Sequence, residues 1–363
     1  MTDLATSKKV PTAATSIRVR RGSRGSLAGG GALVVVVVLM AAVVPYNVSL
    51  GTLTNLVGLF ALIILGTTWN LLAGYGGLVS IGQQGFIGAG GYACVYLANQ
   101  FGLSPVLGVL LAGVVCAVLA YPTSFLLFRL VGGYFAIGTW VVAEVFKLVT
   151  TQFHALGGGS GLSLTAFQGV DQATRIGQVY WLALALAVAV VVATWLLMRS
   201  RWGLGLTALR DDPTAAAGLG VAVRRSQRIV YVVASAAAGL AGALIAVNAL
   251  RVTPDSIYSV SYAAFMIFIV VIGGIGSIEG PILGAVIFYA LQQWLQDNGV
   301  IYLIVLGVVA ILAVLTAPRG LWGLLSGGGR VEFFPVGHRV RTSEREPGGV
   351  GPAEAAADGA PSR

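Results

Sequence analysis

Residues 50–72 read LGTLTNLVGLFALIILGTTWNLL and carry no charged side chain. They belong to a longer tract, residues 25–128, that contains no Asp, Glu, Lys or Arg. A helix rises about 1.5 Å per residue and the hydrocarbon core of a bilayer is about 30 Å thick, so one spanning helix needs roughly 20 residues. The tract therefore has room for several membrane spans.

The composition of the whole chain agrees with this local pattern. Of its 363 residues, 57% are hydrophobic and only 10% are charged, whereas soluble domains have about 25% charged residues. Lipid offers no partners to backbone amides, so apolar tracts of this length must be helical, and the polar-apolar alternation of a β-barrel is missing. The sequence predicts an all-α, polytopic integral membrane protein.

Ten spans account for the apolar tracts, with those near 76–98 and 279–297 expected to be broken or re-entrant. The predicted spans are 29–45, 50–72, 77–98, 105–128, 132–150, 178–198, 229–250, 260–277, 281–297 and 300–317.

Basic residues predict the orientation of these spans, because Lys and Arg near span ends favour the cytoplasmic side. Of the 22 Lys and Arg, six fall in each of residues 1–27, 199–228 and 319–363. Ten spans with the N-terminus inside place all three clusters, and both termini, in the cytoplasm.

We expect three parts along the chain: a disordered basic tail over 1–27, a transmembrane domain over 28–323, and a disordered tail over 324–363. The tails are too rich in Gly, Pro, Ser and charge to bury a core. Their basic charge suits anionic lipid headgroups rather than nucleic acid. Cys94 and Cys116 fall inside predicted spans, and no His, Cys or carboxylate cluster indicates a metal, a cofactor or a catalytic site.

Glycine is abundant, with 51 residues, and it is densest in GYGGLVSIGQQGFIGAGGY (74–92) and GGIGSIEGPILGA (273–285). Small residues let membrane helices approach closely. The first segment is a candidate translocation path because polar side chains lie among its glycines; plain helix packing is the alternative. The candidate residues of this path are Ser80, Gln83, Gln84, Gly85 and Gly88, and Glu144 from a later span.

Glu144 and Lys147 stand three residues apart inside the predicted span 132–150, so they share a helix face and are expected to pair. An ionisable residue inside a span is costly and is a site candidate by default. The alternative is an interfacial ion pair near the outer end of the span.

The sequence contains no motif that would supply energy for transport. It contains three lysines, and none stands in the G-x-x-x-x-G-K-[ST] motif that binds ATP. Buried carboxylates that could couple transport to ions are also scarce. Motive force is therefore expected from another chain.

The charged loop RSRWGLGLTALRDDPTAAAGLGVAVRRSQR (199–228) interrupts the apolar body. Asp212 is a suitable N-cap and Pro213 suits the first helical turn, so a short helix is expected, ended by Gly218 or Gly220. Flanking arginines would hold this helix at the headgroups. Ala215 and Ala216 would let it enter a cleft on a partner; an ordinary amphipathic connector is the alternative.

This loop resembles the Glu-Ala-Ala-x-x-x-Gly loop by which ABC importer permeases dock on their ATPases, with Thr214 in the place of Glu. More specifically, SRWGLGLTALRDDPTAAAGLGV looks like the corresponding loop of the LivM family, the permeases for branched-chain amino acids. Four further segments resemble that family in the same order: NLLAGYGGLVSIGQQGFIGAGGYA, GGYFAIGTWVVAEVFKLV, LGGGSGL and VIGGIGSIEGPILGA. Together they cover most of residues 50–320.

The resemblance implies a non-enzymatic permease subunit in a bacterial plasma membrane. It would work with two cytoplasmic ABC ATPases, a second, LivH-like permease and an extracytoplasmic solute-binding protein. It assigns the ATPase contact to the loop 207–222. The residues that this assignment concerns are Arg210, Asp211, Asp212, Ala215, Ala216 and Gly220. Two alternatives stay open: a permease of the related urea or short-amide importers, and an ATP-independent channel or proton-coupled carrier.

Overall fold

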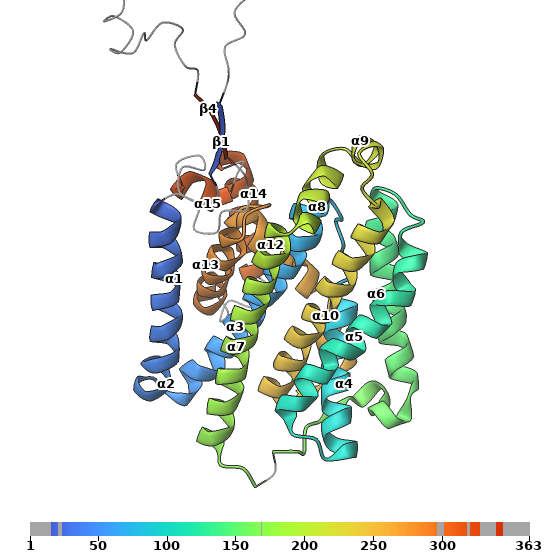
Figure 1. Cartoon of the computed structure of the whole chain (residues 1–363). Helices are drawn as coiled ribbons and strands as arrows, with labels where there is room; N and C mark the ends of the chain where they lie inside the picture. The colour runs from blue at the N-terminus through green and yellow to red at the C-terminus, as the bar shows by residue number, and fades with distance from the viewer. Residues whose placement is uncertain are drawn as a thin grey trace, which may run out of the picture.

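The computed structural model describes residues 16–20, 24–167, 169–295, 301–317, 320–326 and 339–343. These residues form a bundle of helices, which confirms the predicted fold class (Figure 1). Each of the ten predicted spans overlaps one long helix. These helices are α1 Arg24–Ala42, α3 Leu50–Asn70, α4 Gln84–Phe101, α5 Pro105–Leu127, α6 Gly133–Gln152, α7 Gln172–Arg199, α10 Val223–Ala249, α12 Ser261–Gly273, α13 Glu279–Leu295 and α14 Ile301–Thr316.

Shorter elements connect the long helices. They are α2 Val44–Asn47, the π-helix η1 Leu71–Tyr75, the 3-10 turns η2 His154–Leu156 and η3 Gly158–Ser160, α8 Arg201–Asp211, α9 Pro213–Gly218, α11 Pro254–Ile257 and α15 Gly320–Leu325. Two short antiparallel ladders complete the structure, β2 Leu162–Ser163 with β3 Arg251–Val252, and β1 Ser16–Arg20 with β4 Arg339–Ser343.

Six helical segments of the described residues are long and apolar enough to cross a membrane. The segments are Leu50–Tyr75, Pro105–Leu127, Gly133–Gln152, Gln172–Arg199, Val223–Ala249 and Pro254–Gly273. This count concerns the described residues alone, so ten crossings stay a prediction.

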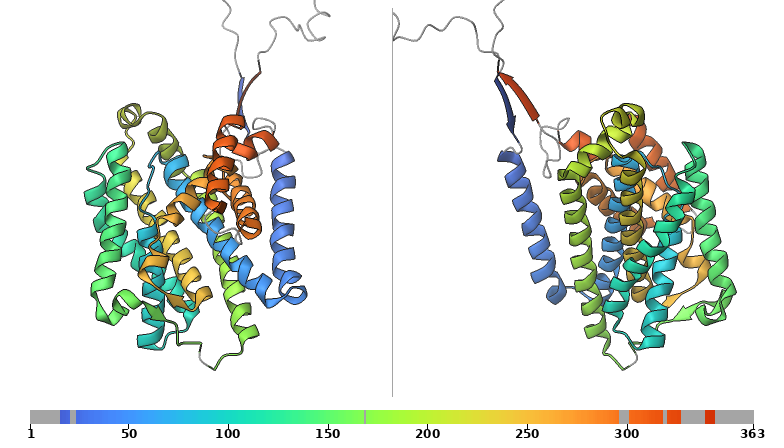
Figure 2. Two further views of the ribbon diagram at one scale, coloured as in Figure 1. Left: turned by 180° about the vertical axis from the view of Figure 1, so that it is seen from behind. Right: turned by 45° about the vertical axis from the view of Figure 1, so that its right-hand side comes forward.

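The described parts of the three basic clusters lie at one end of the bundle. Figure 1 shows α8, α9, α15 and the β1–β4 pair at the top, whereas the connection from α6 to α7 lies at the bottom. The helices α1 and α6 stand at opposite edges of the bundle in each view (Figure 2). The described parts of the three basic clusters therefore lie on the same side of the bundle, as the charge distribution predicts.

Short segments within the two predicted tails have regular secondary structure. β1 pairs with β4 over five residues each, from Ser16 opposite Ser343 to Arg20 opposite Arg339. Ile17 and Val19 alternate with Arg18 and Arg20, a period of two that favours a strand. Helix α1 also begins at Arg24, inside the expected tail 1–27. The remaining residues of both tails, 1–15, 21–23, 327–338 and 344–363, lie outside the described residues.

The helix predicted over 77–98 is broken at its start. After η1, Gly77 takes a left-handed φ of 66°, and regular helix resumes only at Gln84. The Trp69 indole donates a hydrogen bond to the Ser80 carbonyl at 2.8 Å, and the Ile81 amide donates to the Thr139 hydroxyl at 3.2 Å. Neighbouring helices thus satisfy the freed backbone groups, as backbone at membrane depth requires.

A second break precedes α13 rather than lying within it, which corrects the expectation of a break inside 279–297. Gly274 and Gly276 both have positive φ, at 131° and 77°, between α12 and α13. Helix α13 then runs without interruption from Glu279 to Leu295. The glycine-rich sequence places the break where left-handed conformations are available, a few residues before the predicted position.

Helix α10 lies at the centre of the bundle, against α3, α4, α5 and α7 (Figure 1). Its inward face is made of small side chains, so its backbone approaches that of α4 closely. A Cβ atom at Gly242 would overlap the Ile87 carbonyl, and one at Gly90 would overlap Gly239. This close approach explains why small residues recur on both helices.

Replacing Gly242 with alanine is expected to lower the free energy of unfolding by about 1–3 kcal/mol, because the new methyl group forces α4 and α10 apart. Thermal unfolding of the purified chain in detergent measures this change. Gly177→Ala is the matched control, since a Cβ there meets nothing within 4 Å. Equal melting temperatures for the two variants would contradict the close packing.

Candidate functional site

The charged loop 199–228 contains two consecutive helices, α8 and α9. The Asp212 carboxylate accepts hydrogen bonds from the amides of Thr214 at 2.8 Å and Ala215 at 3.0 Å, so it is the N-cap of α9, as predicted. Pro213 opens the helix, and Gly220 follows its end with a left-handed φ of 84°. Local capping chemistry fixes both ends of this helix.

Of the three alanines of α9, one is buried and two are exposed. Ala216 is buried, with 1% of its surface exposed, so it anchors α9 to the rest of the chain rather than facing outward with Ala215. Helix α9 packs against both α8 and α10, which explains this burial. The exposed residues include Ala215, Ala217 and Leu219, and Leu219 is 83% exposed. Asp211, Asp212 and Gly220 are exposed beside them.

Arginines on both sides of α8 and α9 lie over aromatic rings. The guanidinium of Arg199 is 4.8 Å from the Trp195 ring centroid, and that of Arg228 is 3.8 Å from the Phe125 ring. Arg225 lies over Trp202 at 5.9 Å. The Arg225–Trp202 contact joins α8 to α10, the Arg228–Phe125 contact joins α10 to α5, and the Arg199–Trp195 contact lies within α7.

Arg210, the last arginine before α9, ties the segment to the first helix break. Its Nη1 donates to the Gly74 carbonyl at 2.8 Å, across 136 residues of sequence. Its Nε also pairs with the exposed Asp211 carboxylate at 3.1 Å. The backbone of Gly77 lies directly against Arg210, since a Cβ there would stand 3.3 Å from the Arg210 Cα. The segment and η1 therefore form one connected unit.

Asn70, at the end of α3, joins this unit to the second break. Its Oδ1 accepts a hydrogen bond from the Gly276 amide at 2.8 Å, and its Nδ2 donates to the Ser277 carbonyl at 2.8 Å. A Cβ at Gly276 would also lie 3.2 Å from Arg210 Nη1. We call this arrangement of Asn70, Gly74, Arg210, Gly276 and Ser277 the clasp. It brings together both glycine-rich segments and the loop 199–228.

The glycine-rich path candidates lie inside the helix packing. Ser80, Gln83 and Gln84 have no exposed surface. Cβ atoms at Gly85 and Gly88 would press on Ala143 and on the Tyr258 ring. The amide groups of Gln83 and Gln84 make no hydrogen bond within the described part of the chain. In this conformation these residues contact other helices and line neither of the cavities described below.

The expected pairing of Glu144 with Lys147 is wrong. Lys147 Nζ instead pairs with Asp255 Oδ1 of α11 at 2.8 Å, and Glu144 is exposed on α6. The i, i+3 spacing allows the intrahelical pair, but the tertiary fold brings a second carboxylate closer. The Thr150 hydroxyl and the Tyr258 hydroxyl, 2.9 Å apart, form a second link between α6 and the segment that contains α11.

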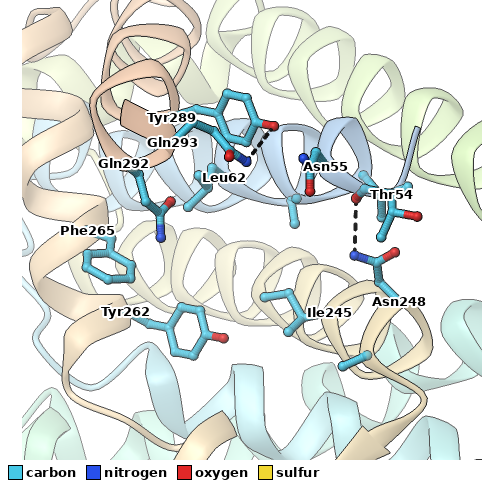
Figure 3. Close-up of a pocket in the computed structure, with 14 residues that line it drawn as sticks. Thr54, Asn55, Leu62, Ile245, Asn248, Tyr262, Phe265, Tyr289, Gln292 and Gln293 are labelled. Atoms are coloured by element: carbon cyan, nitrogen blue, oxygen red, sulfur yellow. Dashed lines mark hydrogen bonds between the residues drawn. The ribbon is translucent and has the colours of Figure 1, made fainter. Parts of the chain in front are cut away.

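Sequence reasoning missed a cavity of about 460 Å³ between α3, α10, α12 and α13 (Figure 3). Its polar groups come from four different helices, so no single sequence motif marks them. They are Thr54, Asn55, Asn248, Tyr262, Tyr289, Gln292 and Gln293. A second, smaller cavity beside α1 is entirely apolar. The described residues contain no group of three or more His, Cys, Asp or Glu placed to hold a metal ion.

Comparisons with known proteins agree with this architecture. The family model described as "Branched-chain amino acid transport system / permease component" matches residues 50–314. The permease protein LivM of the high-affinity branched-chain amino acid transport system is 29% identical in Escherichia coli and 30% identical in Salmonella typhimurium. Each match extends over 307 residues, 77% of this chain and 72% of the relative.

A more distant relative, a probable LivM from Methanocaldococcus jannaschii, is 23% identical over 221 residues, 58% of this chain and 64% of the relative. No solved structure matches the chain. The family match covers well over half of the sequence, including the clasp and the four helices around the larger cavity. The chain is therefore a membrane protein of the family of permease components of branched-chain amino acid transport systems.

Proposed function

We propose that this chain is the translocating subunit of an ATP-driven importer for branched-chain amino acids in a bacterial plasma membrane. The observation that carries the proposal is the exposed face of α9, which packs on α8 and α10 and directly follows the segment in which Arg210 hydrogen-bonds the Gly74 carbonyl. Relatives named for high-affinity branched-chain amino acid transport support the solute class. The chain itself catalyses no reaction.

The partners follow from the same reasoning. Two cytoplasmic ATPase subunits would bind α9 and the corresponding helix of a second permease, because this sequence has no ATP-binding motif of its own. An extracytoplasmic binding protein would deliver solute to the opposite face. With α9 in the cytoplasm, both termini of the chain lie there as well.

An exposed carboxylate on α6 supports the proposal of a second permease. Glu144 lies near the middle of α6, on the outer side of the bundle, and it forms no ion pair within 4.0 Å among the described residues. A carboxylate facing hydrocarbon is costly. Large apolar side chains such as Trp140 and Leu148 are exposed on the same helix. A homologous permease that packs on α6 would remove Glu144 from lipid.

The test is leucine uptake by proteoliposomes that contain this chain, a second permease, the ATPases and a binding protein. We expect uptake to require ATP inside the vesicles and to persist when ionophores abolish ion gradients. Omitting the second permease should abolish uptake. Uptake by this chain alone down a concentration gradient, unaffected by ATP, would refute the importer in favour of a channel.

A further inference from the structure

We propose that the cavity between α3, α10, α12 and α13 is a binding site for the transported solute within the membrane domain, selective for net-neutral zwitterions with an aliphatic side chain. This inference rests on the proposed function and adds a location and a recognition chemistry to it. The cavity volume of about 460 Å³ lies within the range of about 300–1,000 Å³ typical of small-molecule sites.

The cavity presents hydrogen-bonding groups that the protein leaves unused. The side chains of Asn55, Tyr262 and Gln292 form no hydrogen bond within the described ranges of the chain. Tyr262 and Gln292 extend from α12 and α13 into the same space (Figure 3). Asn55 is exposed, whereas Tyr262 and Gln292 are half-buried, and polar groups withdrawn from water cost free energy until they are paired. A polar solute would supply the partners that these groups lack.

The lining holds no charged residue among its 14 members. A solute with an uncompensated positive or negative charge would enter without a counter-charge, at a large desolvation cost. A zwitterion avoids much of that cost, because each amide side chain offers both NH₂ donors and a carbonyl acceptor. The NH₂ groups suit a carboxylate and the carbonyl groups suit an ammonium. The site therefore favours net-neutral amino acids over lysine or glutamate.

The rest of the cavity is apolar, which distinguishes an amino acid from a small amide. Its apolar lining includes Val57, Ala61, Leu62, Ile245 and Phe265. A buried aliphatic side chain gains roughly 1.5–3 kcal/mol from such surroundings. Urea has no apolar part, so it would bind the polar groups alone and leave this surface unfilled. The apolar lining thus argues against the urea alternative.

The position of the cavity fits a solute site that responds to the cytoplasmic segment. Thr54 and Asn55 lie in the first turns of α3, whose other end carries Asn70 of the clasp. Tyr262 and Gln292 lie on α12 and α13, the two helices that flank the second break. A movement of the clasp would therefore shift opposite walls of the cavity relative to each other.

The experiment measures protection of a cysteine in the cavity by solutes. In a Cys94→Ala/Cys116→Ala background, Gln292→Cys is labelled with a small methanethiosulfonate in the purified complex with its ATPases and second permease. Saturating L-leucine should slow labelling about fivefold or more, because an occupied site excludes the reagent. L-Lysine, L-glutamate and urea at the same concentration should leave the rate within about twofold of the free value.

Gln100→Cys is the matched control, since Gln100 is an exposed glutamine at the end of α4 and lies outside the lining. Its labelling should not respond to any solute. Protection by urea equal to that by leucine would overturn the recognition chemistry. No labelling at Gln292→Cys, or labelling that leucine leaves unchanged, would overturn the site. ATPase co-purification is scored on the same samples, so failure of the site in an intact complex is distinguishable from failure of the proposed coupling.

Discussion

Leu219→Glu is expected to detach the ATPase subunits while the permease stays folded in the membrane. Leu219 is 83% exposed at the end of α9, next to the exposed Ala215 and Ala217. An apolar side chain this exposed on a well-anchored segment is suited to burial against a partner. Burying a leucine contributes roughly 1.5–3 kcal/mol, and a buried unpaired carboxylate would add a further penalty.

The expected weakening of ATPase binding is at least about tenfold to a hundredfold, since about 1.4 kcal/mol corresponds to a factor of ten. Co-purification of the ATPases with the tagged permease measures it, and ATP-dependent leucine uptake should fall in parallel. Leu219→Met, which keeps the apolar contact, is the matched control and should retain both. Normal co-purification of Leu219→Glu would show that α9 is an ordinary connector.

Ala216 requires a different interpretation from its neighbours. Because its side chain is buried within the chain, Ala216→Leu would displace α9 from α8 and α10 rather than obstruct a partner. Loss of ATPase binding in that variant would therefore not separate docking from folding. Substitutions on the exposed side, at Ala215, Ala217 or Leu219, make that distinction.

Local signals in the sequence predicted much of this structure. The position of α9 follows from Asp212, Pro213 and Gly220, because capping depends on residues only a few positions apart. The long helices follow from apolar tracts, since lipid leaves the backbone no other regular structure. The break before Gln84 follows from the density of glycine in residues 74–91.

Features that depend on distant residues could not be predicted in the same way. The pairing of Lys147 with Asp255 joins residues 108 positions apart. The sequence instead favoured Glu144, because it lies three residues from Lys147 on the same helix. The six residues of α9 are too few for periodicity to show which alanine faces inward. Asn55 and Gln292 belong to different helices, so only the fold places them around one cavity.

Arg210→Ala is expected to separate ATP hydrolysis from transport without releasing the ATPases. The Arg210 side chain points to Gly74 rather than to the outer side of α9, and its hydrogen bond to the Gly74 carbonyl connects α8 with η1. Asn70 continues the connection to Gly276 and Ser277, and so to α12 and α13. Movement of α9 by the ATPases would reach the helices around the cavity through these contacts.

A hydrogen bond from a charged group contributes about 1.5–3 kcal/mol. If that coupling free energy is lost, leucine uptake per ATP hydrolysed should fall by about tenfold or more. Uptake and phosphate release by the same proteoliposomes measure the ratio, and co-purification should stay at the level of the unmodified chain. Arg210→Lys keeps the charge without the planar guanidinium, so it should give an intermediate ratio.

Asp211→Asn is the matched control for the clasp, because it removes only the exposed ion pair of Arg210 and leaves the Gly74 contact in place. Exposed pairs contribute about 0–1 kcal/mol, so its uptake ratio should stay within a few-fold of the original. Equal losses in Arg210→Ala and Asp211→Asn would assign the effect to surface charge. Loss of the ATPases from Arg210→Ala would instead make Arg210 part of the docking surface, and the clasp would then have no role in transmitting movement.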